Sequence, residues 1–200
     1  MRKPSPNKKA RINQRSFEYK RANERGVFAV RRLLSPQSYD SIRQTTDLLN
    51  HELKNIGRTF EVETIGVTIV GFSRFFRKHM LNGPATSLIT ENIVSAKYPI
   101  EVVLGRLGVY GPDSRAKLAV SIESPELVHE ELAYRKAYED RGYSLNNRWT
   151  YQPHCSLALI ASDYVEHFND PRSISRLNKL TGLGKMIEQS IVLEPVRVNS

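Results

Sequence analysis

The chain has 200 residues, of which 40% are hydrophobic, and a formal net charge of +9. This size and composition suit an ordinary globular protein with one substantial core. No apolar run approaches the ~20 residues that cross a bilayer, and the first residues lack the apolar segment of a secretory signal. We therefore expect a cytoplasmic protein without a membrane partner, and we expect a monomer.

Cofactor and metal chemistry have little support in the sequence. Cys155 is the only cysteine, so neither an internal disulfide nor a multi-cysteine metal site can form, and we expect a buried structural thiol. Carboxylates with metal-ligand spacing and a dinucleotide fingerprint are absent from the sequence. The segment Gly182–Lys185 lacks the spacing of a phosphate loop and is predicted to be a turn. We expect no metal and no cofactor.

Positive charge is concentrated in residues 1–25, which contain nine lysines and arginines against two glutamates, or +7 of the chain's +9. This arm has almost no apolar periodicity and is predicted to be disordered when free. Residues 26–200 are nearly balanced in charge and are predicted to form a single two-lobed domain. The arm is either an electrostatic tether to RNA or another polyanion, or a solubilising tail, and the sequence leaves both alternatives open.

The first half of this domain is predicted to alternate strands and one long helix. Val27–Leu34 is typical of a strand, and Ser35 with Pro36 provides the cap and first residue of an amphipathic helix that Gly57 ends. Thr59–Val62 is predicted to be a short strand and Ile65–Phe72 a longer one. The basic-aromatic segment Arg74–Lys78 either grips a phosphate backbone or places its phenylalanines in the core.

The second half repeats this pattern of strands and helices. It begins with a short predicted helix around Ser87–Ala96, then strands over Ile100–Leu104 and Leu107–Tyr110 and a turn at Gly111–Asp113. A strand over Lys117–Ser121 and a helix from Ser124 to Gly142 follow. The last predicted elements are a strand over His154–Leu159, a helix from Asp170 that includes Ile174, Leu177 and Leu180, and a strand over Ile191–Val198 that Pro195 interrupts.

The most informative pair of residues is His154 and Ser156, two positions apart on a predicted strand. Successive strand side chains point to opposite faces, so these two project together while Cys155, Leu157 and Leu159 point the other way. An imidazole with a pKa near ~6.5 can donate or accept a proton near neutrality. A neighbouring hydroxyl can hold a phosphate or carbonyl oxygen. One face of this strand is thus suited to chemistry.

With its surroundings, this segment resembles the second His-x-Ser/Thr signature of the two-histidine phosphoesterase superfamily, which includes RNA 2',3'-cyclic phosphodiesterases and 2'-5' RNA ligase-like proteins. The resemblance extends from about Gly26 to Val198 and includes the upstream order of Leu107–Gly111, an apolar strand and a helix. It implies an α+β fold of two similar lobes around a pseudo-twofold axis, with antiparallel sheets flanked by helices. Each lobe is expected to give one His-x-Thr/Ser motif to a central cleft.

The resemblance places the first motif in Ile65–Phe72, where Thr68 matches the hydroxyl position and Gly66 stands where the histidine belongs. Members of the superfamily use one histidine to activate water or a hydroxyl and the other to protonate the leaving oxygen. Loss of one positioned proton-transfer group typically costs ~100-fold to ~10,000-fold in rate. A glycine inside a strand often marks the close approach of a ligand or another chain segment. The remaining histidines offer no replacement at the sequence level: His51, His79, His129 and His167.

Three functions follow from this interpretation. The first is a metal-independent phosphodiesterase of the 2',3'-cyclic phosphate or 2'-5' linkage type, acting on RNA or nucleotides. The resemblance then implies His154 as the acid or base and Thr68 and Ser156 as ligands of phosphate oxygens. The second is a catalytically inactive RNA- or nucleotide-binding protein with the same cleft. The third is an adaptor that uses the domain as a scaffold, because fold does not fix function.

Overall fold

The computed structural model describes residues 29–54, 56–71, 83–111, 116–141, 151–183 and 189–198. The basic arm 1–25 and the basic-aromatic segment Arg74–Lys78 lie outside these residues. Other predicted elements lie partly outside them, at residues 27–28, 72, 112–113, 142 and 184–185.

The described residues contain the following elements: β1 (Ala29–Leu33), α2 (Tyr39–Glu52), β2 (Gly57–Thr59), β3 (Gly66–Gly71), α4 (Gly83–Asn92), β4 (Ile100–Tyr110), β5 (Lys117–Glu123), α5 (Pro125–Glu139), β6 (His154–Ile160), α6 (Val165–Asn169), α7 (Pro171–Thr181), β7 (Gln189–Leu193) and β8 (Arg197–Val198). Short 3-10 turns at Pro36–Ser38, Val62–Thr64, Val94–Lys97 and Ser162–Tyr164 connect several of them.

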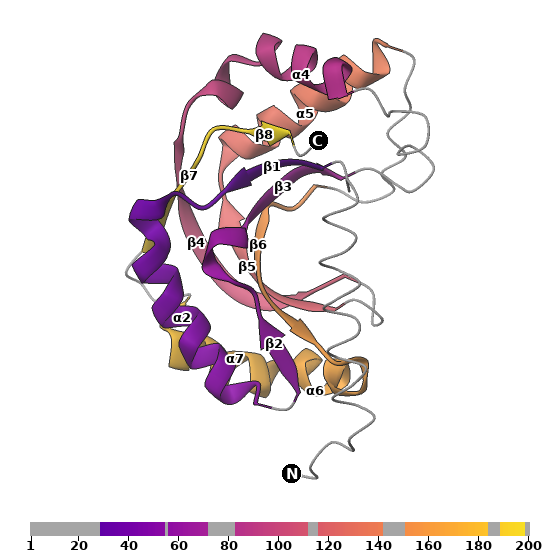
Figure 1. The fold of residues 1–200 in the computed structure, drawn as a ribbon. Helices are drawn as coiled ribbons and strands as arrows, with labels where there is room; N and C mark the ends of the chain where they lie inside the picture. The colour runs from indigo at the N-terminus through magenta and orange to yellow at the C-terminus, as the bar shows by residue number, and fades with distance from the viewer. Residues whose placement is uncertain are drawn as a thin grey trace.

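All of the described strands belong to one antiparallel sheet. Their order is β7-β4-β5-β6-β3-β1-β8, and β2 pairs with β6 beside β3. A further bridge joins Leu34, just after β1, to Leu193 of β7. Because β7 and β1 lie near opposite ends of the strand order, this bridge requires the sheet to curl, as Figure 1 shows.

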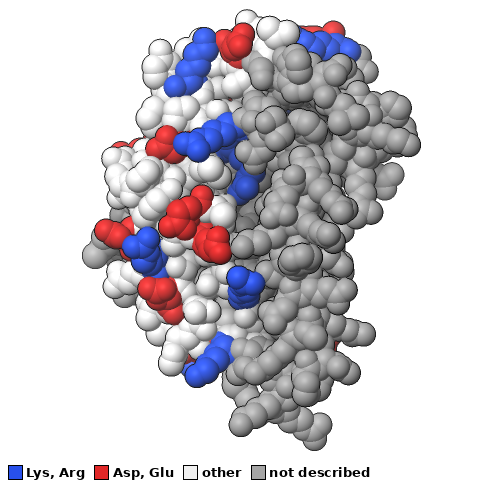
Figure 2. Space-filling model, viewed as in Figure 1, with Lys and Arg blue, Asp and Glu red and all other residues white. Residues whose placement is uncertain are grey.

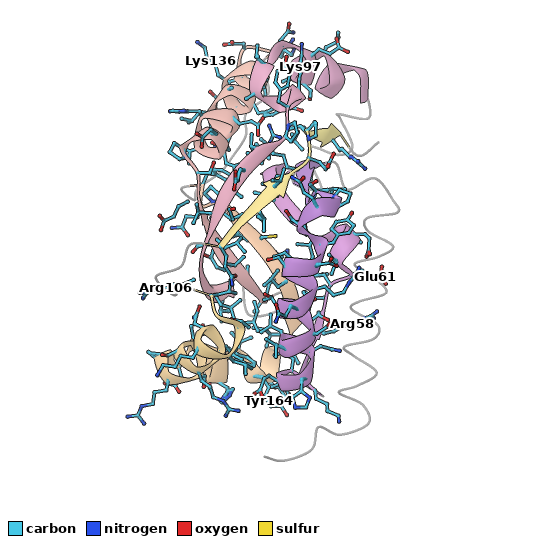
Figure 3. The ribbon with its side chains drawn as sticks, turned by 90° about the vertical axis from the view of Figure 1, so that its left-hand side faces the viewer. Arg58, Glu61, Lys97, Arg106, Lys136 and Tyr164 are labelled. Atoms are coloured by element: carbon cyan, nitrogen blue, oxygen red, sulfur yellow. The ribbon has the colours of Figure 1, made fainter. Side chains whose placement is uncertain are left out.

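The helices form two groups around the curled sheet (Figure 1). Helix α2 packs on α7, β2 and β6, and α6 and α7 pack on β4. Helix α5 packs on α4 and β3. In the view of Figure 3, α2 runs vertically at the right-hand side of the molecule, and Arg58 and Glu61 lie beside it. The arrangement is an α+β fold with an antiparallel sheet flanked by helices, as the sequence predicts.

Two of the predicted helices, α5 and α7, begin where their capping residues indicate. The Ser124 hydroxyl accepts a hydrogen bond from the amide of Leu127 at 3.3 Å, and Pro125 is the first residue of α5. The Asp170 carboxylate caps α7 in the same way, through the amide of Arg172 at 3.3 Å. Gly182 ends α7 in the left-handed conformation, with φ of 75°, which a glycine adopts at little cost.

The first predicted helix does not begin at its predicted cap. Ser35 and Pro36 lead into a 3-10 turn, α2 begins at Tyr39, and it ends at Glu52 rather than at Gly57. The helix predicted around Ser87–Ala96 is α4, which begins earlier, at Gly83, followed by the 3-10 turn Val94–Lys97.

Several predicted boundaries are wrong. The two strands predicted before and after Gly105 are one strand, β4, with a shift in its pairing to β5 between Leu104 and Leu107. The strand predicted over Thr59–Val62 lies earlier, as β2, and a 3-10 turn begins at Val62. Helix α6 was not predicted, because its five residues are too few to show a helical period. The final strand is interrupted at Pro195 as predicted, giving β7 and β8.

A buried ion pair fastens β1 to α5. Arg32 donates through Nε and Nη2 to the two carboxylate oxygens of Glu130, at 2.8 and 2.9 Å. Their side chains are 0% and 1% exposed. The same guanidinium donates to the carbonyls of Ser95, Tyr98 and Glu194. These bonds give the buried guanidinium both an opposite charge and hydrogen-bond acceptors, and a buried arginine needs both.

Charges of both signs are interspersed on the described part of the face shown in Figure 2. This mixture agrees with the nearly balanced charge of residues 26–200. In the part of the chain that the structure describes, no helix has the length and apolar character needed to span a membrane.

Candidate functional site at the junction of β3 and β6

The two predicted motif strands are neighbours in the sheet. Val67 of β3 pairs with Cys155 of β6, and both side chains are fully buried. In an antiparallel pair, the positions on either side of a paired couple also lie opposite each other, on the other face. That register places Thr68 opposite His154 and Gly66 opposite Ser156. The structure thus brings together the candidate positions from both halves of the chain.

Burial agrees with this alternation. His154 and Ser156 are half-buried and Thr68 is exposed, whereas Cys155 and Leu157 are fully buried. The predicted alternation ends after Leu157, because the pairing of β6 with β5 shifts there by one residue. Leu159 consequently does not share the full burial predicted for the Cys155 face and is only half-buried.

The imidazole of His154 has a defined protonation pattern. Its Nδ1 lies 2.8 Å from the carbonyl oxygen of Gln152. Because a carbonyl oxygen can only accept a hydrogen bond, Nδ1 carries the proton, and the lone pair of the neutral ring is on Nε2. The ring is therefore oriented by the residue two positions earlier, and Nε2 is left to accept a proton.

The electrostatic surroundings keep this histidine neutral. Burial is the largest effect and lowers the pKa of His154 below its usual value of 6.5. The Gln152 carbonyl acts in the opposite direction by accepting from the ring, and the positive charge of Lys117 adds to the lowering. At neutral pH His154 is accordingly a potential proton acceptor.

Ser121 of the neighbouring strand β5 and Tyr110 of β4, the strand beyond it, both lie close to His154. The Tyr110 ring stacks on the imidazole, with centroids 4.5 Å apart and an angle of 17° between the planes. Ser121 pairs with His154 across β5 and β6, and its hydroxyl accepts from the amide of Arg106 at 2.9 Å. Burial raises the pKa of Tyr110, and a hydrogen bond with Ser121 partly opposes that shift.

These two neighbours were not identified as site residues from the sequence. Their contact with His154 depends on strand pairing, which a single sequence does not show. One signal was present: Gly108 lies two residues before Tyr110, and a Cβ at that glycine would lie 3.4 Å from the tyrosine ring. A small residue beside an aromatic one on a strand allows the ring to lie flat along the sheet.

The space beside Gly66 is filled by the main chain of β1. A Cβ at this position would lie 2.2 Å from the carbonyl oxygen of Arg32 and 2.9 Å from the Cα of Leu33. These distances are far inside normal contact. The close neighbour that a glycine in a strand predicts is thus another chain segment. With this backbone, a side chain at residue 66 has no room unless β1 moves.

Tyr151 connects the segment before β6 to β3. Its hydroxyl donates to the main-chain carbonyl of Thr68 at 3.2 Å. Burial, followed by the negative charges of Glu130 and Glu131, raises the pKa of Tyr151, so its proton is retained for this bond. The bond helps to fix the relative position of the two motif strands.

The fold was compared with known proteins. The protein TT0787 of Thermus thermophilus matches with a TM-score of 0.53 and 10% sequence identity, over 66% of this chain and 73% of that chain. The chain therefore shares the fold of TT0787 over the matched region. No protein-family profile and no curated protein sequence matches this chain.

Two further structures match this chain with lower TM-scores. Usb1 of Kluyveromyces marxianus matches with a TM-score of 0.48 and 14% identity, over 86% of this chain and 93% of that chain. The MHV ns2 PDE domain matches with a TM-score of 0.46 and 15% identity, over 66% of this chain and 77% of that chain.

The other described histidines lie on helices and not on the motif strands. His51 lies on α2, His129 on α5 and His167 on α6. His79 is outside the described residues. Among the residues that the structure describes, no group of three or more histidine, cysteine, aspartate or glutamate side chains could hold a metal ion.

Proposed function

We propose that the face shared by β3 and β6 binds an RNA or nucleotide phosphodiester of the 2',3'-cyclic or 2'-5' type. One observation carries this proposal: the register of Val67 with Cys155 sets both predicted motifs side by side on adjacent strands. In the proposed complex, the Thr68 and Ser156 hydroxyls donate hydrogen bonds to phosphate oxygens. His154 is the proton-transfer group.

The chemistry follows from the neutral ring of His154. Water or a hydroxyl attacks phosphorus while Nε2 takes its proton, and the bond from phosphorus to one ribose oxygen breaks. The leaving oxygen then receives a proton from the imidazolium or from water. Without a second positioned acid, the rate is expected to be about 100-fold to 10,000-fold below that of a site with two proton carriers. We therefore propose a slow phosphodiesterase.

A second candidate function is a binding protein without turnover. The observation in its favour is Gly66, where the Arg32 carbonyl oxygen occupies the space that a side chain would need. A histidine is thus excluded from that position at the present backbone. Binding needs only hydroxyls and positive charge, so ligand affinity can persist where proton transfer has been lost.

The two candidates are separated by incubating the protein with RNA that ends in a 2',3'-cyclic phosphate and with a 2'-5' linked oligonucleotide, followed by chromatography. Turnover that His154→Gln loses and His129→Gln keeps supports the phosphodiesterase. His129 is a matched control because it is an exposed histidine on α5. Binding without turnover in all three proteins supports the second candidate. The absence of both binding and turnover would refute the proposed site.

The basic arm is proposed to add non-specific affinity for RNA. If about five of its charges neutralise single-stranded phosphates, the logarithm of affinity should fall with the logarithm of salt concentration at a slope of roughly −3.5. Deletion of residues 1–25 should flatten that slope. An unchanged slope would mean that the arm is a solubilising tail.

A further inference from the structure

A third residue lies in the row formed by Thr68 and His154. Arg31 of β1 pairs with Thr68 of β3, and Thr68 lies opposite His154 by the register of β3 with β6. Residues paired directly across antiparallel strands share a face of the sheet. Arg31, Thr68 and His154 therefore occupy consecutive places across β1, β3 and β6, on the face of the candidate site.

The guanidinium of Arg31 has unused hydrogen-bonding capacity. Its Nη2 donates to the carbonyl of Thr64 at 3.1 Å. Its Nε is buried and has no hydrogen-bond partner among the described residues. No carboxylate in the described ranges forms an ion pair with it. Buried polar groups are nearly always paired, so an unpaired donor beside a candidate site calls for an explanation.

The adjacent arginine provides an internal comparison. Arg32 points to the other face, where Glu130 and three carbonyls satisfy its guanidinium. Its role is explained by the stability of the fold. Arg31 is one residue away in the sequence, yet it lies on the site face and has one recorded bond. The two arginines thus have different surroundings and different expected roles.

We propose that Arg31 binds the phosphate oxygens of the ligand at this face and determines the preference of the site for anionic phosphate. This inference rests on the proposed function and adds a residue to it. Arginine presents five donors in a planar fork that matches phosphate oxygens, and these charge-assisted bonds are stronger than bonds between neutral groups. The Thr64 carbonyl accepts from Nη2 and Nε is buried, so the remaining end of the fork, Nη1, is the one proposed to meet the ligand first.

Arg31 replaces only part of what a histidine at position 66 would supply. A guanidinium remains protonated throughout the physiological pH range, so it stabilises negative charge but does not transfer protons. The site then contains one group for proton transfer, His154, and one fixed positive charge, Arg31. This combination favours ligand binding over rapid turnover.

The test measures binding of adenosine 2',3'-cyclic monophosphate and of adenosine 3'-monophosphate by titration calorimetry. Loss of a charge-assisted hydrogen bond is expected to weaken binding of both by about tenfold or more in Arg31→Gln. Arg31→Lys keeps the charge without the fork and should fall between wild type and Arg31→Gln. Arg172→Gln, the same change at an exposed position of α7, should bind as wild type does.

Thermal unfolding of each variant separates ligand binding from folding. Because the hydrogen bond of Arg31 to the Thr64 carbonyl is exposed and its Nε has no partner in the described residues, Arg31→Gln should lower the unfolding temperature only slightly. If wild type binds both nucleotides and Arg31→Gln binds them equally well, the role of Arg31 is refuted and the proposed function stands. If wild type binds neither nucleotide nor RNA, the proposed function itself fails. Should Arg31→Gln not fold, wild-type affinity in Arg31→Lys would overturn the proposal.

Discussion

Tyr110 covers one face of the His154 imidazole, with the two ring centroids 4.5 Å apart. The contact joins the end of β4 to the start of β6 across β5. It contributes to the burial that keeps the imidazole uncharged. The aromatic ring is therefore expected to control the acid–base properties of the candidate site as well as its shape.

Replacing Tyr110 with alanine should raise the pKa of His154 towards 6.5, because water then reaches the imidazole and burial is the largest cause of the present lowering. An NMR titration of the His154 ring protons measures this shift. Tyr98→Ala is the control, since that tyrosine is 62% exposed. An unchanged pKa in Tyr110→Ala would show that the stack does not protect the ring.

The lowered pKa of His154 also makes stability depend on pH. The folded state favours the neutral ring, so the unfolded state binds more protons in the window between the folded-state pKa and about 6.5. The free energy of unfolding should therefore fall as the pH decreases through this window. Above about pH 6.5 the contribution of His154 should not change with pH. Urea unfolding at several pH values should show this dependence in wild type and a weaker one in His154→Gln.

Breaking the Arg32–Glu130 pair should strongly destabilise the protein. Removal of one partner leaves the other charge buried, which typically costs about 3–5 kcal/mol. Glu130→Leu and Arg32→Met should each show this loss in urea unfolding, and the double variant should recover part of it. Arg43→Met is the control: Arg43 is 52% exposed in its contact with Asp40, so its loss should cost less than about 1 kcal/mol.

Gly66→Ala should destabilise the fold far more than Gly108→Ala. At position 66 the added Cβ would meet the Arg32 carbonyl oxygen at 2.2 Å, whereas at position 108 it would meet only the Tyr110 ring at 3.4 Å. Forcing a methyl group into a packed site costs about 1–3 kcal/mol or more. Thermal unfolding compares the two variants. Equal stability would mean that the backbone of β1 can shift to accept the methyl group at little cost in free energy.

Thr68→Val should weaken binding of a 2',3'-cyclic nucleotide by about fivefold to tenfold, because it replaces a hydroxyl donor by a methyl group of similar size. Thr68→Ser keeps the hydroxyl and should retain most of the affinity. Since Thr68 is exposed, neither change should alter thermal stability much. Titration calorimetry measures the affinity of the three proteins for the nucleotide. Wild-type affinity in Thr68→Val would show that the Thr68 hydroxyl does not bind the ligand.

The sequence was informative where local patterns decide the structure. Caps and apolar spacing located α5 and α7, and period-two alternation placed Cys155 in the core and His154 with Ser156 on the other face. The register of β3 with β6 could not be predicted, because it depends on contacts between segments far apart in the chain. The same limit hid Tyr110, whose contact with His154 crosses three strands.

The two arginines of β1 show a related limit. Adjacent positively charged residues in an otherwise apolar strand suggest an exposed edge, yet Arg32 is fully buried by its bonds to Glu130 and to main-chain carbonyls. Only the pairing of β1 with β3 distinguishes its surroundings from those of Arg31. Local charge pattern alone does not separate a structural arginine from one that faces a site.

The close approach of the Arg32 carbonyl to Gly66 affects how this protein could evolve or be engineered. A histidine at position 66 is not within reach of one substitution, because the strand spacing must widen first. Any library that aims to install a second proton carrier should therefore vary β1 together with residue 66. If β1 is kept fixed, selection for faster turnover is expected to yield substitutions at other positions of the sheet.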